Sequence, residues 1–210
     1  MLQLFLTLLL LCSQTFSQQD SRSTNAMECP DVKTGHIEIQ KTAPIIVGGV
    51  RAYATVQLRR ASDDTNGDSC MVTYKLFVAH GNGKYVPVKK YSEKAEGSVG
   101  AEMIGASKNE KVLAADFWWA EGDYTGHRPV IYDVEAKSAH SRALNNEIRK
   151  QLPSCDYFEE FIGVTDTGEA IIRVPKSAYV DQGCPAQGEW LFDVQSGRVQ
   201  RTKPKSAPHK

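Results

Sequence analysis

The chain has 210 residues, of which 41% are hydrophobic and 24% charged, a composition typical of a globular protein with one sizeable core. Its 25 lysines and arginines balance 25 aspartates and glutamates, so no overall field draws it toward nucleic acid or an anionic membrane. The balance argues against both partners and leaves room only for a local patch of charge.

Residues 1–17 are predicted to be a signal peptide. Residues 1–11 form a leucine-rich run with only two polar interruptions, which matches the apolar region of a signal sequence. The run is shorter than the about 20 residues that span a bilayer. Small residues at Thr15 and Ser17 favour cleavage before Gln18. No lysine or arginine precedes the run, and the alternative is a buried N-terminal helix. We expect a secreted protein, extracellular or periplasmic, with no transmembrane segment.

Cleavage there would remove Cys12 and leave four cysteines: Cys29, Cys70, Cys155 and Cys184. An even number in an exported chain indicates disulfides, and four cysteines allow three pairings. We favour Cys155 with Cys184, because a hairpin predicted around 167–168 brings them toward each other, and Cys29 with Cys70. The spacing suits no zinc site, so the sequence predicts no metal and no cofactor.

The chain is expected to form one domain between two polar ends. Residues 18–31 lack any period and predict a flexible lead-in, while the basic, proline-broken residues 203–210 predict a disordered tail. Residues 32–202 are predicted to form a single β-rich domain.

Within that domain, alternating apolar residues and turn signals predict successive antiparallel strands. Residues 51–60 alternate and lead through Asn66-Gly67, a hairpin-favouring pair, into residues 71–79. Further strands are predicted on either side of turns at 81–83, 107–110, 166–168 and 196–197. The fold class is therefore mainly β, an antiparallel meander arranged as a sandwich or as a partial propeller.

One segment predicts a helix on the surface of the sheet. Leu144, Ile148 and Leu152 recur every four residues between 141 and 152, Pro153 ends the pattern, and Ser138 or Ser141 would cap its start. Residues 36–40 predict a short strand with His36 and Glu38 on its wet side.

A faint internal repeat is carried by Tyr132-Asp-Val134 and Phe192-Asp-Val194, with a degenerate third copy at 73–78. Strand ends of this kind resemble the blades of β-propellers of the WD or kelch type, over residues 70–202. Three such units cannot close a propeller, which needs about four blades, so a closed ring would imply oligomerisation. The alternative is a single meander or sandwich.

The best candidate contact surface lies between residues 116 and 127. In a strand, Ala114, Asp116 and Trp118 share one face, which would leave an indole beside a carboxylate in solvent, while Trp119 belongs to the core. The candidate binding residues are Asp116, Trp118, Glu121, Asp123, Tyr124 and His127. The alternative is that a second layer covers Trp118.

Residues 63–68 resemble the opening of a calcium loop, but Ser69 and Lys75 stand where a glycine and a bidentate acid belong, which favours a plain turn. No nucleophile motif or phosphate loop is present. The sequence therefore favours a secreted, non-catalytic binding module whose ligand is a carbohydrate or a protein. The alternatives are a small extracellular hydrolase that uses Asp116, Glu121 or Asp123, and a structural component of a cell envelope.

Overall fold

The computed structural model describes residues 26–33, 35–62, 69–122, 124–152, 159–176 and 183–202. The strands are β1 (Met27–Glu28), β2 (Ile37–Lys41), β3 (Ile45–Val47), β4 (Val50–Arg60), β5 (Ser69–His80), β6 (Val86–Glu96), β7 (Ser98–Ala106), β8 (Val112–Glu121), β9 (Tyr124–Asp133), β10 (Ser138–Ser141), β11 (Glu160–Val164), β12 (Ala170–Val174), β13 (Gly188–Phe192) and β14 (Val199–Arg201). A 3₁₀ turn, η2 (Cys29–Asp31), and one α-helix, α1 (Leu144–Gln151), complete the described elements. The predicted mainly β, antiparallel fold class is confirmed.

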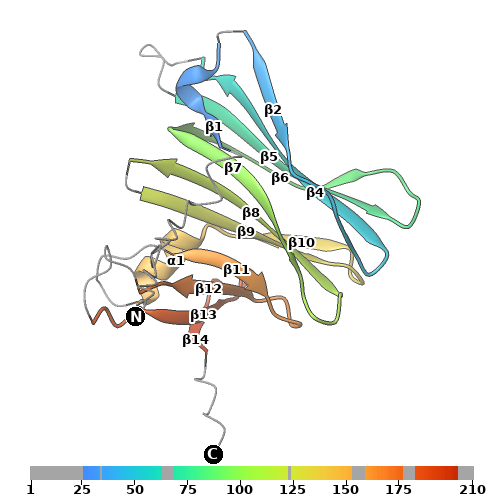
Figure 1. Cartoon of the computed structure of the whole chain (residues 1–210), viewed down its shortest axis with the longest axis vertical. Helices are drawn as coiled ribbons and strands as arrows, with labels where there is room; N and C mark the ends of the chain where they lie inside the picture. Colours follow the sequence, from blue (N-terminus) through green and yellow to red (C-terminus); the bar gives the residue numbers. More distant parts are fainter. Residues whose placement is uncertain are drawn as a thin grey trace, which may run out of the picture.

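The strands form three antiparallel sheets, stacked as three layers (Figure 1). The first sheet has the order β2-β4-β5-β6, with β3 also paired to β4. The second has the order β1-β7-β8-β9-β10, and the third has β11-β12-β13-β14. The second sheet lies between the other two, and α1 packs beside the third sheet.

Each interface between layers holds a hydrophobic core. One core joins the first and second sheets, and the other joins the second sheet to the third sheet and α1. Because side chains alternate along a strand, Leu113, Ala115 and Phe117 of β8 enter the first core while Val112 and Ala114 enter the second. The central strand β8 is therefore buried on both faces.

The helix matches its predicted apolar stripe and differs at its start. Leu144, Ile148 and Leu152 are all buried in the second core, as their spacing predicts. The N-cap residue is Ala143, which makes no side-chain capping bond, so the predicted serine caps are wrong. Packing of the stripe, rather than capping, positions this short helix.

The N-terminal end of the described chain belongs to the fold. Met27 pairs with Val99 of β7, and Cys29 forms a disulfide with Cys70 of β5, which confirms that predicted bond. The predicted flexible lead-in is therefore wrong for residues 27–31, which form β1 and η2, while residues 18–25 lie outside the described residues. Cys184 is also disulfide-bonded, but Cys155 lies outside the described residues, so their pairing stays a prediction.

The signal peptide, the calcium-like loop at 63–68 and the tail at 203–210 all lie outside the described residues. Among the helices that are described, none combines the length and the apolar character needed to cross a bilayer.

Strand β2 has the reverse of its predicted orientation. Ile37 and Ile39 face solvent and are 59% and 65% exposed, whereas Glu38 and Gln40 are half-buried. The alternation was predicted and its direction was wrong. A two-residue period does not say which face is covered, and apolar character on an edge strand is a weak guide to burial.

The repeated segments occupy equivalent places. Each segment falls on the third strand of a four-strand path: 129–134 on β9, 189–194 on β13 and 73–78 on β5. The first two segments run past the end of their strand into the turn that follows. Asp133 accepts a hydrogen bond from the Ala136 amide, and Asp193 accepts bonds from the amides of the turn that follows it. The aspartates therefore stabilise matching hairpin turns. The resemblance to propeller blades stays a prediction.

Both turns have a left-handed residue four positions after the aspartate, but one turn has glycine there and the other has lysine. Gly197 has a φ of +79° and Lys137, at the matching place, has a φ of +52°. Left-handed backbone is strained for a residue with a Cβ. We expect Lys137→Gly to raise the free energy of unfolding by about 0.5–1 kcal/mol, after allowance for the greater freedom of glycine in the unfolded chain. Urea denaturation measures the change.

The matched control is Lys108→Gly, an exposed turn residue whose own φ is not positive. There the substitution should only destabilise, because glycine adds entropy to the unfolded chain and relieves no strain. Equal effects of the two substitutions would contradict the assignment of strain to Lys137.

Candidate functional site

The predicted contact residue Trp118 is buried. It is 6% exposed, on the face of β8 that the third layer covers, and its indole lies across Gly100 on the neighbouring strand, where a Cβ would overlap the ring. The structure therefore contradicts the solvent-facing indole and agrees with the alternative, that a further layer covers Trp118, because both faces of the second sheet are covered. Trp119, predicted as core, is half-buried against the first core.

Asp116 and His127 form a buried pair. The Nδ1 atom of His127 lies 2.6 Å from Oδ2 of Asp116, and the two residues are 0% and 1% exposed respectively. The His127 amide donates to Oδ1 of Asn145 on α1. Within the described part of the chain, Oδ1 of Asp116 and Nε2 of His127 have no hydrogen-bond partner. Both side chains belong to the second sheet, on β8 and β9, and neither lines the cleft described below. The bond from the His127 amide to Asn145 links this sheet to α1.

The other predicted residues do not join this pair. Glu121 is exposed at the end of β8, and its odd position directs it to the opposite face from Asp116. Asp123 and the side chain of Tyr124 lie outside what the structure describes. The structure thus brings together Asp116, His127 and Trp118, in the protein interior, and does not bring Asp116 and Glu121 together as an acid and base.

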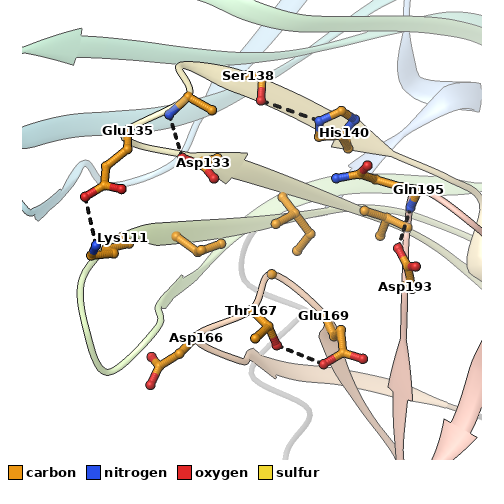
Figure 2. A pocket seen from close by; sticks show the side chains of 15 residues that line it. Lys111, Asp133, Glu135, Ser138, His140, Asp166, Thr167, Glu169, Asp193 and Gln195 are labelled. Carbon is orange, nitrogen blue, oxygen red and sulfur yellow. Dashed lines mark hydrogen bonds and ion pairs between the residues drawn. The ribbon is translucent and has the colours of Figure 1, made fainter.

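A cleft of about 670 Å³ opens between the second and third sheets (Figure 2). Its walls are hairpin turns: the β9–β10 turn on one side, and the β11–β12 and β13–β14 turns on the other. Val112, Ile131 and Val194, all buried, supply apolar surface. The volume lies in the range of small-ligand sites, which makes this cleft the candidate functional site.

The charged side chains around the cleft are mostly acidic. They comprise five carboxylates, one lysine and one histidine: Asp133, Glu135, Asp166, Glu169, Asp193, Lys111 and His140. Lys111 is paired with Glu135 at 2.9 Å, and both side chains are largely exposed. The lining therefore carries a clear excess of negative charge.

Local hydrogen bonds hold these carboxylates in place. Oδ1 of Asp166 accepts the amide of Asn109, which links the β11–β12 turn to the β7–β8 turn. Glu169 accepts bonds from Thr167 and from Gln200. Oδ2 of Asp193 accepts the hydroxyl of Ser196, a bond that lowers the pKa of Asp193 and keeps it ionised in mild acid. The acidic lining is thus fixed by the turns that form it.

The carboxylates are spread around the cleft rather than gathered at one point. Among the residues that the structure describes, no group of three or more His, Cys, Asp or Glu side chains is placed to hold a metal ion. The cleft therefore offers several separated acceptors above an apolar floor.

Prediction from the sequence missed this cleft, although one signal was present. The repeat singled out Asp133 and Asp193 as strand-end residues, and both line the cleft. Asp166 and Glu169 belong to a turn that had been identified only as a turn. Nothing in the sequence showed that turns from two sheets face each other across one space.

Comparisons of the chain with protein-family models, with curated proteins and with solved structures find no match. The functional argument therefore rests on the geometry of the cleft and on its charges.

Proposed function

We propose that the chain is a secreted, non-catalytic binding module whose acidic cleft takes an aliphatic ligand that carries ammonium groups. The single observation behind this proposal is the lining: five carboxylates against one lysine and one histidine, around a cleft with an apolar floor. Carboxylates are acceptors for ammonium donors, and the valine and isoleucine side chains suit the methylene groups between them.

Two sources supply this chemistry, a free polyamine and a lysine side chain of a peptide or protein. Both combine a positive end with an apolar stem, and both fit a space of about 670 Å³. A neutral carbohydrate would leave the excess of acidic charge uncompensated. The sequence suggested a carbohydrate or a protein as the ligand. The charge of the lining favours the protein and makes polyamines a further candidate.

Export is the second part of the proposal, and the disulfides support it. The bond between Cys29 and Cys70, both fully buried, fits a protein that folds in an oxidising compartment. A signal peptide at residues 1–17 would deliver the chain there. Expression of the full chain with mass measurement of the exported product would test cleavage before Gln18.

Isothermal titration calorimetry of the protein with spermidine, and separately with a lysine-rich peptide, tests whether the cleft binds these ligands. We expect at least one of them to bind, and the variant Glu135→Gln with Glu169→Gln to weaken binding about tenfold, because each lost exposed ion pair is worth up to about 1 kcal/mol. Binding should also fall as the pH drops, and because the Ser196 hydrogen bond lowers the pKa of Asp193, that residue should keep its charge to a lower pH than an ordinary aspartate.

The matched control is Glu96→Gln with Glu102→Gln, which removes the same charge from exposed positions outside the cleft. That variant should bind like the parent. If neither ligand binds at millimolar concentration, or if both double variants weaken binding equally, the cleft is not the site.

A further inference from the structure

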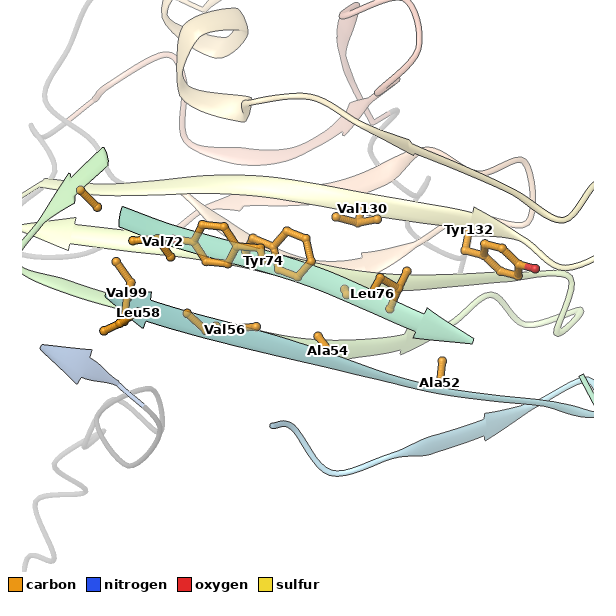
Figure 3. Packing of buried hydrophobic residues seen from close by; sticks show 14 of the residues in the cluster. Ala52, Ala54, Val56, Leu58, Val72, Tyr74, Leu76, Val99, Val130 and Tyr132 are labelled. Carbon is orange, nitrogen blue, oxygen red and sulfur yellow. The ribbon is translucent and has the colours of Figure 1, made fainter. Parts of the chain in front are cut away.

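The first sheet has one face in the core and one in solvent. Ala52, Ala54, Val56 and Leu58 of β4 point toward the second sheet (Figure 3). The alternate positions therefore point away from it, on the side that Figure 1 shows without a further layer of the described chain. We call this side the outer face. It comprises the odd positions of 37–41, 51–59 and 71–77 and the even positions of 90–94.

The outer face carries cations and no carboxylate. Its charged positions are Lys41, Arg51, Arg59, Lys75, Lys90 and Lys94. Among the described residues, the acidic position that continues this side is Glu96, at the end of β6, where it pairs with Ser69. The formally neutral chain therefore separates its charges, with carboxylates around the cleft and cations on the first sheet.

Three of these lysines lie in one row across four strands. Lys41 pairs with Thr55, Thr55 pairs with Lys75, and Lys75 pairs directly with Lys90. Like charges at directly opposed positions destabilise a sheet. The row therefore costs stability in the isolated chain, and an anionic partner would relieve the repulsion.

The same sheet carries exposed apolar side chains. Of the described residues, the large hydrophobic side chains exposed to solvent are Ile37, Ile39, Ile46 and Val86, all on strands of this sheet. Ile37 and Ile39 share the outer face with Lys41, and Ile46, 74% exposed, pairs with the outward Arg51. Exposed apolar groups beside cations mark surfaces that contact a membrane or another protein.

The aromatic rings of this face are occupied. Tyr53 stacks on Phe77 with ring centroids 4.9 Å apart, and Nζ of Lys41 lies 3.7 Å from the centroid of the Tyr53 ring. Arg51 lies 5.2 Å from the ring of Tyr85. Rings held in this way do not form an open platform on which nucleic-acid bases could stack.

We propose that the outer face docks on an anionic lipid bilayer, with the lysines and arginines at the headgroup phosphates and the isoleucines in the interfacial region. A broad sheet face can bring all of these groups to a planar surface at once. Clusters of lysine and arginine bind anionic leaflets, and apolar side chains strengthen such binding. A second copy of the chain fits poorly, because the symmetric contact would oppose lysines to lysines.

Co-sedimentation with vesicles tests the proposal. We expect the chain to bind vesicles of phosphatidylcholine with one quarter phosphatidylglycerol, to ignore phosphatidylcholine alone, and to be released by high salt. Lys75→Glu with Lys90→Glu should weaken binding by at least about tenfold, since each basic residue near an anionic surface contributes about a fivefold step. Ile37→Ser with Ile39→Ser should weaken binding without reducing its salt dependence.

The matched control is Lys108→Glu with Lys150→Glu, two exposed lysines in the β7–β8 turn and on α1 with the same change of net charge. It should bind almost like the parent, and thermal melting of every variant checks that the sheet is intact. The membrane assignment would be overturned if both lysine variants lost the same affinity, or if the chain did not bind anionic vesicles. It would also be overturned if the chain bound heparin or single-stranded DNA more tightly and the isoleucine variant kept that binding.

Discussion

Replacing His127 by alanine should lower the free energy of unfolding by about 3–5 kcal/mol. His127 and Asp116 lie in the interior with Nδ1 and Oδ2 2.6 Å apart, and removal of the imidazole would leave the carboxylate buried without its partner. Oδ1 of Asp116 already has no hydrogen-bond partner within the described residues, so the carboxylate could not transfer its interaction elsewhere. Guanidinium denaturation of the variant measures the loss.

A double-mutant cycle separates the pair from simple loss of volume. Asp116→Ala with His127→Ala should cost clearly less than the sum of the two single variants, because the double variant leaves no orphaned partner. Additive losses would show that the two side chains do not stabilise each other, and would contradict the stabilising role assigned to the pair between β8 and β9.

Removing the bond between Cys29 and Cys70 should be nearly as costly. The cysteines are 41 residues apart, and closing a loop of that length lowers the entropy of the unfolded chain by an amount worth about 4 kcal/mol in the chain-entropy estimate. The bond also fixes η2 against β5, and the Cys29 amide donates to the carbonyl of Gly97, between β6 and β7. Cys29→Ala with Cys70→Ala should therefore melt about 10 °C below the parent.

The single variant Cys70→Ala distinguishes the cross-link from packing of the sulfur atoms. It loses the bond and keeps one sulfur atom in the core, so it should fall by nearly the same amount as the double variant. If both variants melt with the parent, the cross-link does not stabilise this fold.

The period of two along the strands was readable from the sequence, and the number of layers was not. Alternation in β8 correctly separated Phe117 from Asp116 and Trp118. The same alternation could not show that a third sheet covers the second side, because the strands that form it lie more than forty residues further along the chain. Trp118 and His127 were therefore candidate contact residues, with a covering layer over Trp118 as the alternative, and both lie in the interior.

The distribution of charge over the surface was the second property that the composition did not show. A net charge of zero correctly described the whole chain and gave no hint that Lys75 and Lys90 would lie side by side. Strand register decides that placement, and register depends on pairing across the hairpin. Asp133 and Asp193 were visible as a repeat, but their shared cleft depends on how the second and third sheets pack.

The separation of charge is tested most directly by amide chemical shifts of the isotope-labelled chain during titration with spermidine. Shifts should be confined to the cleft, in residues 111–112, 131–140, 166–169 and 193–195, and should be absent from β2, β4 and β5. Shifts spread over the first sheet, or none at millimolar ligand, would contradict the assignment of the cleft as the site for cations.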